Sequence, residues 1–250
     1  MCIRDSNYIG LTGVLNAMGE DGQVPQPPLN LVGDYGGGSL FLVSGVLAAL
    51  LSARSSGEGR VLDVAMIDGA LSMFGLMFSM HSEGNWSTTR ASNMLDGSAP
   101  FYRCYLCKDK RFMAVGALEP AFFREMLELL DIDAADYGEQ YDKNQYAQQN
   151  ALLESTFASK DRDSWAQLFD GSDACVTPVL DYIEARDHPH MKARQALIER
   201  DDVLHPNMAP RFSGLDFNPP QTPARGQQTR ELLEELSLPA DVIDTLLEGV

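Results

Sequence analysis

The sequence predicts a mixed α/β protein, and two kinds of pattern support that prediction. Apolar residues recur at helical spacing over 39–54 and again over 68–83. Two runs with strand-like alternation, 101–107 and 111–117, flank a short turn, which is typical of a β-hairpin. Helices and an antiparallel sheet are therefore expected in the same chain.

The helix expected over 39–54 begins directly after three glycines at 36–38. Apolar side chains occupy nearly every face of this segment, which is the pattern of a helix enclosed by other elements. We therefore expect this helix to belong to the core.

A short strand is expected over 60–66, followed by the helix over 68–83. In that helix Met73, Met77 and Met80 recur at positions i, i+4 and i+7. Thioether side chains adapt to irregular apolar partners. The three methionines are therefore either ordinary packing residues or a pliable surface for an acyl chain.

The chain beyond the hairpin is expected to add helices to the sheet and then to continue through a proline-rich connector. Helical patterns cover 120–130, 143–159 and 162–169, a strand covers 175–179, more helix extends to about 199, the connector covers 205–226, and amphipathic helices cover 231–236 and 241–247.

The charge balance limits the classes of partner. The 250 residues include 19 Lys and Arg against 36 Asp and Glu, a net charge of −17, which disfavours binding to nucleic acid or to an anionic membrane surface. The apolar run over 40–51 is shorter than the roughly 20 residues that span a bilayer, and no secretory signal pattern precedes it. Neither nucleic acid nor a membrane is therefore expected as a partner.

The cysteine and histidine patterns indicate neither disulfides nor a metal site. Four cysteines in a chain of ordinary composition do not form a disulfide framework, so a reducing compartment such as the cytoplasm is expected. Cys104 and Cys107 fall in a strand-like run, where plain packing is favoured over zinc binding or redox chemistry. His188, His190 and His205 have no cysteine ligand nearby, so no metal is expected there.

Three motifs occur in order along the chain: LNLVGDYGGG at 29–38, NMLDGSAPFY at 93–102 and VGALEP at 115–120. Together with DACVTPVL at 173–180 and TRELLEEL at 229–236, they resemble the family III CoA-transferase superfamily, and within it the α-methylacyl-CoA racemases. The resemblance extends from Asn7 to the C-terminus.

The resemblance implies the C-terminal part of a family III CoA-transferase fold, in which an incomplete Rossmann-like large domain is joined to a small α/β domain. The chain is then expected to be an N-terminally truncated fragment, with an opening MCIRDS that is foreign to the family. The implied domains are a remnant of the large CoA-binding domain at 1–60, a linker with a helix at 61–100, the small α/β domain at 101–204, an extended connector at 205–228, and C-terminal helices returning to the large domain at 229–250.

The implied reaction inverts the α-carbon of a 2-methylacyl-CoA thioester, and two acid/base groups must straddle that carbon. By resemblance Asp34 is one of them, and Glu119 is a third active-site carboxyl that the partner subunit of an interlocked homodimer supplies. Asn30 and Tyr102 are implied hydrogen-bond partners of the site. CoA is part of the substrate, so no separate cofactor is expected.

The second acid/base group is altered in this sequence. The family motif Gly-His-Asp-Ile-Asn-Tyr aligns with residues 3–8, so Asp5 is retained while Arg4 stands in the position of the catalytic histidine. A guanidinium stays protonated at physiological pH and cannot accept a proton. Racemisation by this chain is therefore expected to fail.

Considered as residues alone, Asp34 and Glu119 have simpler interpretations. Asp34 precedes an apolar helix, where aspartate is a preferred N-cap. Alternatively, its carboxylate is the base and its backbone N–H, near a helix N-terminus, is a donor to the enolate oxygen. Glu119 precedes Pro120 and could be a plain helix-start acid.

Two other functions remain open from the sequence. In a family III CoA-transferase, the aspartate at the position of Asp34 is the nucleophile that forms an aspartyl-CoA thioester. Alternatively, the chain is a non-catalytic fragment or a dimerisation module. The sequence does not specify the acyl chain.

Overall fold

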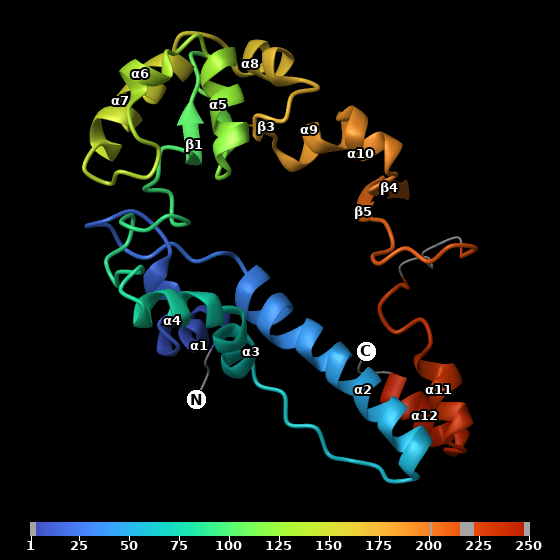
Figure 1. The fold of residues 1–250 in the computed structure, drawn as a ribbon. Helices are drawn as coiled ribbons and strands as arrows, with labels where there is room; N and C mark the ends of the chain where they lie inside the picture. Colours follow the sequence, from blue (N-terminus) through green and yellow to red (C-terminus); the bar gives the residue numbers. More distant parts are fainter. Residues whose placement is uncertain (1–3, 201, 216–222, 248–250) are drawn as a thin grey trace. The chain divides into compact units, whose positions relative to one another are not determined.

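The computed structural model describes residues 4–200, 202–215 and 223–247. The chain divides into two compact units, Met1–Leu180 and Asp181–Val250 (Figure 1). The division falls inside the segment 101–204 that the sequence predicts as one small domain, and the domain assignments stay a prediction.

The first unit begins with a group of helices. Helices α1, η2 and α3 pack around a small core of Ile9, Val14 and Ala70, to which Val32 and Phe74 add partly buried surface. The elements are α1 (Asp5–Leu11), the 3-10 helix η1 (Leu15–Ala17), the π-helix η2 (Leu31–Ser39), α2 (Leu40–Ser56), α3 (Met66–Met73) and α4 (Gly75–Ser82).

The helix predicted over 39–54 is confirmed as α2, which ends at Gly57 in the left-handed conformation. Its predicted burial is wrong, because none of residues 40–56, all of which the structure describes, is buried. Leu47 and Leu51, for example, are more than half exposed. In the first unit, the side chains of this apolar helix are therefore half-buried or exposed rather than enclosed.

Helices η2 and α2 run on without a break over Leu31–Ser56. Among the described residues this is one helical segment, 26 residues long, that is long and apolar enough to cross a membrane by length and composition. The sequence analysis disfavours a membrane span because the apolar run over 40–51 is too short, whereas this helical segment is longer than that run. Length and composition do not distinguish a membrane helix from one covered by protein.

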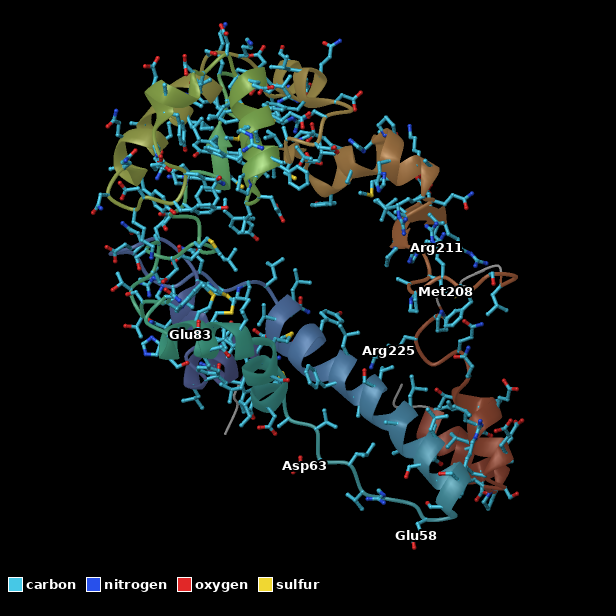
Figure 2. The ribbon with its side chains drawn as sticks, in the orientation of Figure 1. Glu58, Asp63, Glu83, Met208, Arg211 and Arg225 are labelled. Atoms are coloured by element: carbon cyan, nitrogen blue, oxygen red, sulfur yellow. The ribbon has the colours of Figure 1, made fainter. Side chains whose placement is uncertain are left out.

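The strand predicted over 60–66 is wrong. Residues 58–65 form no helix or strand, and Met66 already begins α3. Val61 is 98% exposed, and Glu58 and Asp63 project from an extended segment (Figure 2). A strand requires a neighbour for its backbone hydrogen bonds, and no strand among the described residues is paired with this segment.

The helix predicted over 68–83 is two helices, because α3 ends at Met73 and Phe74 separates it from α4. Met73 lies at the end of α3, whereas Met77 and Met80 lie on α4. The three methionines therefore do not form one stripe on a continuous helix.

The α/β part of the first unit contains the predicted hairpin. Strands β1 (Tyr102–Leu106), β2 (Phe112–Gly116) and β3 (Val176–Val179) form one antiparallel sheet in the order β1-β2-β3. One sheet face packs on a core that includes Tyr105, Met113 and Val115. The helices that complete this core are α5 (Pro120–Leu129), α6 (Ala134–Tyr137), α7 (Tyr146–Phe157) and α8 (Arg162–Phe169).

The second unit contains a hairpin that the sequence does not predict. Strands β4 (Leu197–Arg200) and β5 (Val203–Pro206) pair where helix is expected to about 199, and β5 extends into the predicted connector. Asp202 at the turn has a positive φ of 59°, which a helix excludes. The other elements are α9 (Tyr182–Asp187), α10 (Pro189–Ala193), α11 (Thr229–Glu235) and α12 (Ala240–Leu247), the last two confirming the predicted terminal helices.

The loop of the NMLDGSAPFY motif is held by a buried amide. Asn93, 2% exposed, donates from Nδ2 to the carbonyls of Ser87 and Thr89 at 3.1 and 3.2 Å and to Asp96 at 2.8 Å. Its Oδ1 accepts the Ser87 N–H at 2.7 Å. Every polar atom of this side chain is paired, so the motif stabilises the chain just before β1.

We expect Asn93→Ala to lower the free energy of unfolding by about 1–3 kcal/mol, because the substitution removes every hydrogen bond that this buried amide makes to the loop. Urea denaturation followed by circular dichroism measures this loss. Asn85→Ala is the matched control, because Asn85 is exposed and a surface substitution of this kind is expected to change stability by less than about 0.5 kcal/mol. Equal effects of the two substitutions would contradict the role assigned to Asn93.

Candidate functional site

The residues predicted for the site fall into two groups within the first unit. Asp5, Asn30 and Asp34, together with the altered position Arg4, lie among the helices. Tyr102 and Glu119 lie on the α/β part. No hydrogen bond or ion pair joins Asp34 to Glu119 within the described ranges, so each group is considered separately.

Asp34 lies within η2 rather than at its start. Asn30 occupies the N-cap position, and its carbonyl accepts the N–H of Tyr35 at 3.1 Å, the i to i+5 spacing of a π-helix. The interpretation of Asp34 as an N-cap is therefore wrong. Its side chain is exposed, and its carbonyl accepts the Ser39 hydroxyl at 2.9 Å.

The glycines that follow Asp34 let α3 approach η2 closely. A Cβ atom at Gly37 would lie 2.8 Å from the Met66 carbonyl oxygen, closer than side chains tolerate. One at Gly36 would lie 3.1 Å from the Met73 methyl carbon. The thioethers of α3 consequently pack directly against the π-helix that carries Asp34.

Asp5 pairs with the backbone of Asp34. Its Oδ2 accepts the Asp34 N–H at 2.8 Å, while its Oδ1 is buried with no partner among the described residues. Gly33 lies directly beneath this carboxylate, and a Cβ there would collide with Oδ2. The N–H that the sequence predicts as a donor to the enolate oxygen donates to Asp5 in this structure, and its role toward a substrate stays a prediction.

Arg4 occupies the N-cap position of α1. Its backbone N–H donates to Asn7 Oδ1 at 3.1 Å, and its side chain is exposed. Across the described residues, no hydrogen bond or ion pair connects the guanidinium to Asp5 or Asp34. The arginine therefore stands next to Asp5 without neutralising it through a direct contact.

The second group is arranged around the open face of the sheet. Tyr102, 37% exposed, begins β1 on the face opposite the core. A shallow groove on this side is bordered by Tyr102, Cys104, Ala114, Gly116, Cys175 and Thr177. The face leaves an aromatic hydroxyl and two thiols accessible to a second molecule.

Glu119 is the N-cap residue of α5, with Pro120 in the first helical position. Its carbonyl accepts the Phe123 N–H at 3.0 Å, and its side chain is exposed and caps no backbone group. Partial desolvation, then the charges of Glu119, Asp173 and Glu125, raise the pKa of the nearby Cys175 thiol. Cys175 is also tied to the strand that leads to Glu119, because its carbonyl accepts the Gly116 N–H at 2.9 Å.

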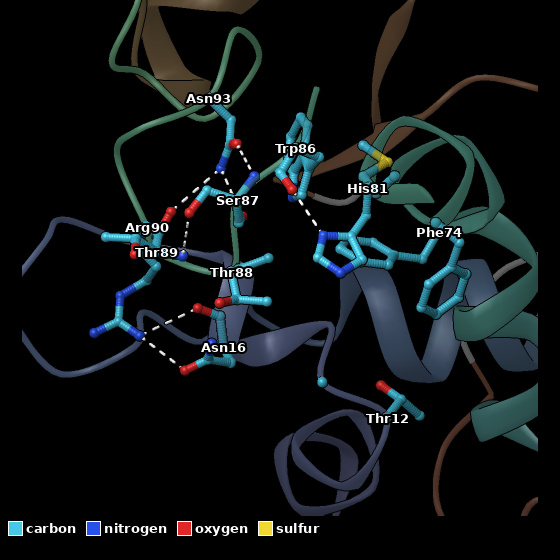
Figure 3. A pocket seen from close by; sticks show the side chains of 14 residues that line it. Thr12, Asn16, Phe74, His81, Trp86, Ser87, Thr88, Thr89, Arg90 and Asn93 are labelled. Atoms are coloured by element: carbon cyan, nitrogen blue, oxygen red, sulfur yellow. Dashed lines mark hydrogen bonds between the residues drawn. The ribbon is translucent and has the colours of Figure 1, made fainter. Parts of the chain in front are cut away.

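Two cavities among the helices of the first unit are absent from the sequence prediction. One, of about 210 Å³, lies between the end of α1, helix α4 and the loop that follows (Figure 3). There His81 Nδ1 donates to the Trp86 carbonyl at 2.8 Å, and Arg90 donates to Asn16. The other, a groove of about 480 Å³, is lined mainly by apolar residues that include Val32, Met73 and Met77. In the sequence, the only indication of either cavity is the helical spacing of Met73 and Met77.

The comparisons with known proteins decide the family. The model of CoA-transferase family III matches residues 4–229. The chain belongs to CoA-transferase family III. Its mixed α/β structure has the fold of that family, and the crystal structure of a CAIB/BAIF family protein from Brucella suis matches 93% of this chain and 62% of that protein with a TM-score of 0.73 at 21% identity.

Two relatives that the chain resembles in sequence are α-methylacyl-CoA racemases. The chain is 38% identical over 235 residues to alpha-methylacyl-CoA racemase of Mus musculus, covering 93% of this chain and 62% of the relative. It is 35% identical over 246 residues to the Homo sapiens racemase, covering 96% and 64%. The chain therefore spans less than two thirds of the length of these relatives.

The contact between Asp5 and Gly33 predicts that replacing this helical glycine by alanine destabilises the protein, whereas alanine ordinarily stabilises a helix. We expect Gly33→Ala to lower the free energy of unfolding by about 1–3 kcal/mol, because its methyl group overlaps the Asp5 carboxylate. In the background Asp5→Ala, the same substitution is expected to be neutral or stabilising, since alanine favours helix. Chemical denaturation of the four variants gives the coupling free energy. Additive effects would contradict the contact.

Proposed function

We propose that this chain carries active-site residues of an α-methylacyl-CoA racemase-like isomerase. The reaction is inversion at the α-carbon of a 2-methylacyl-CoA thioester by two-base proton transfer through an enolate. The observation that carries the proposal is the identity with the racemases, which covers nearly the whole chain and includes the segment around Asp34.

Asp34 is the proton-transfer group in this proposal. Its carboxylate lies exposed on a π-helix, a geometry that often marks functional positions. Removal of the α-proton by this carboxylate leaves an enolate with its charge on the thioester oxygen. Because Asp5 engages the Asp34 N–H, the donor to that oxygen must be a different group.

The apolar groove beside η2 is a suitable place for the acyl chain. Val32 and Met73 border it from η2 and α3, and Met77 and Trp86 extend it. Unbranched thioethers can repack around a branched chain in either configuration of the α-carbon. This supports the second interpretation of Met73 and Met77, whereas Met80 lies outside this groove.

A homodimer completes the proposed site. Asp34 and Glu119 are both exposed and are not joined by a hydrogen bond within the described chain. An interlocked dimer would bring the Glu119 of one subunit to the Asp34 of the other. The apolar helix α2, which the described residues leave uncovered, also supports the requirement for further protein contacts.

The chemistry requires no cofactor besides the CoA of the substrate, because the thioester itself acidifies the α-proton. The number and spacing of the four cysteines do not form the pattern of a disulfide framework, which supports a reducing compartment such as the cytoplasm. Arg4 is the element that does not fit inversion, because a guanidinium cannot act as the second base.

We expect the chain with Arg4 to show no inversion of either enantiomer of a 2-methylacyl-CoA. Arg4→His supplies an imidazole that can take and return a proton, and general acid–base catalysis contributes on the order of 10²-fold or more. In a chain completed to the full length of the racemases, the inversion rate of this variant is therefore expected to rise above background by at least about 10²-fold. Chiral chromatography of the hydrolysed acyl group measures inversion, and mass spectrometry after reaction in D₂O measures α-hydrogen exchange.

Two controls make that assay decisive. Arg4→Gln removes the charge without adding a base and is expected to stay inactive, and Asp34→Asn in the Arg4→His background is expected to abolish the gain. Inversion by the unaltered chain would refute the two-base assignment. A covalent CoA adduct on Asp34 would establish the CoA-transferase alternative, and a folded but inactive Arg4→His variant would support the non-catalytic alternative.

A further inference from the structure

A buried amide and a tyrosine hydroxyl hold the backbone just before Glu119. Gln140 is buried, and its Nε2 donates to the carbonyls of Ala117 and Leu118 at 3.1 and 2.9 Å. The hydroxyl of the next residue, Tyr141, donates to the same Leu118 carbonyl at 2.5 Å. Both accepting carbonyls thus belong to the two residues that directly precede Glu119.

The loop that supplies these donors is itself anchored. Gln149, on α7, is buried and donates to the carbonyls of Tyr137 and Glu139 at 3.3 and 3.0 Å. The Glu139 N–H donates in turn to Gln145 Oε1 at 3.2 Å. Gln140 therefore reaches the 117–118 carbonyls from a fixed base rather than from a free loop.

Tyr141 also contacts the segment that carries the other site residue of this group. Its ring meets the ring of Phe101 edge to face, with 5.3 Å between centroids. Phe101 is fully buried and directly precedes Tyr102. One side chain therefore links the backbone before Tyr102 to the backbone before Glu119.

Glu119 is also fixed from its C-terminal side. Pro120 begins α5, and the Glu119 carbonyl accepts the first helical hydrogen bond, from Phe123. With the peptide groups on both sides held, the direction in which the Glu119 side chain leaves the backbone is determined. Its own carboxylate caps no backbone group and is left available.

We propose that Gln140 and Tyr141 form a clamp that positions the Glu119 carboxylate for its role at the active site. Neither residue touches the reacting atoms, so both are positioning residues. The role of the clamp in catalysis rests on the proposed function. The placement of Glu119 by the clamp rests only on the hydrogen bonds described above.

Cys175 is a reporter of that placement and requires no substrate. Gly116, at the end of β2, donates its N–H to the Cys175 carbonyl at 2.9 Å, which ties Cys175 to the segment that leads to Glu119. Partial burial raises the pKa of its thiol, and the charges of Glu119, Asp173 and Glu125 raise it further. Glu125 accepts the Asp173 N–H at 3.1 Å. A carboxylate that moves away lowers the thiol pKa and increases its reactivity.

The experiment measures alkylation of each cysteine by iodoacetamide between pH 7 and 10, resolved by mass spectrometry of peptides. Glu119→Gln sets the scale, and it is expected to lower the Cys175 pKa and to increase its alkylation rate near pH 8 by about 2-fold or more. Gln140→Met, which keeps the volume but removes the donor, is expected to change the rate in the same direction. Tyr141→Phe is expected to give a smaller increase, because it removes one hydrogen bond and keeps the ring contact.

Two controls separate positioning from general loosening. Cys104 on the same sheet face reports global changes and is expected to be unaffected in every variant. Asn150→Leu removes another amide donor of this part, the one that binds the Ser98 carbonyl at 3.0 Å, and is expected to lower stability while leaving Cys175 unchanged.

The possible results separate clearly. A normal Cys175 pKa in Gln140→Met and Tyr141→Phe, with a shifted one in Glu119→Gln, would overturn the clamp. No response of Cys175 to Glu119→Gln would contradict a Glu119 carboxylate held near that thiol, and with it the placement that the clamp is proposed to give. Because no CoA thioester is present, failure of the racemase assay leaves these results unchanged.

Discussion

The close packing of α3 against the glycines of η2 is the constraint on which the site depends. A side chain at Gly37 would meet the backbone of Met66 and Ala70, and one at Gly33 would meet the Asp5 carboxylate. Glycine therefore permits three elements, α1, η2 and α3, to converge at a distance that other residues exclude. The π-helical hydrogen bonding places Asp34 on the exposed side of this junction. The LNLVGDYGGG motif is consequently a packing requirement as much as a chemical one.

This packing is independent of the residue at position 4. Arg4 caps the first turn of α1 through its backbone, and among the described residues its exposed side chain makes no hydrogen bond or ion pair with Asp5 or Asp34, so the packing around them does not use the guanidinium. What changes is the chemistry, because an imidazole exchanges protons at neutral pH and a guanidinium does not. The fold and the proton-transfer capacity of this site are therefore separable, and family membership alone does not establish activity.

The sequence predicts those features that depend on local patterns. The hairpin of β1 and β2, the start of α5 at Pro120 and the terminal helices α11 and α12 follow from turn residues, proline and amphipathic spacing. The π-helix is not predictable in this way, because its widened turn depends on contacts with α3. The failed strand over 60–66 and the unexpected exposure of α2 have a common cause. Both predictions assume neighbouring elements, and the described residues do not supply them.

The two groups of site residues differ in how their positions are fixed. Asp34 is fixed by backbone contacts that tolerate no side chain, whereas Glu119 is fixed by the side chains of Gln140 and Tyr141 acting on its neighbours. Catalytic groups must be held within about 0.5 Å of a productive geometry. If the two groups meet only across a subunit interface, contacts within one group cannot adjust the position of the other. Each must therefore be positioned within its own chain before the subunits associate. For Glu119, the buried Gln140 meets that requirement, because it donates to the carbonyls of the two residues before Glu119.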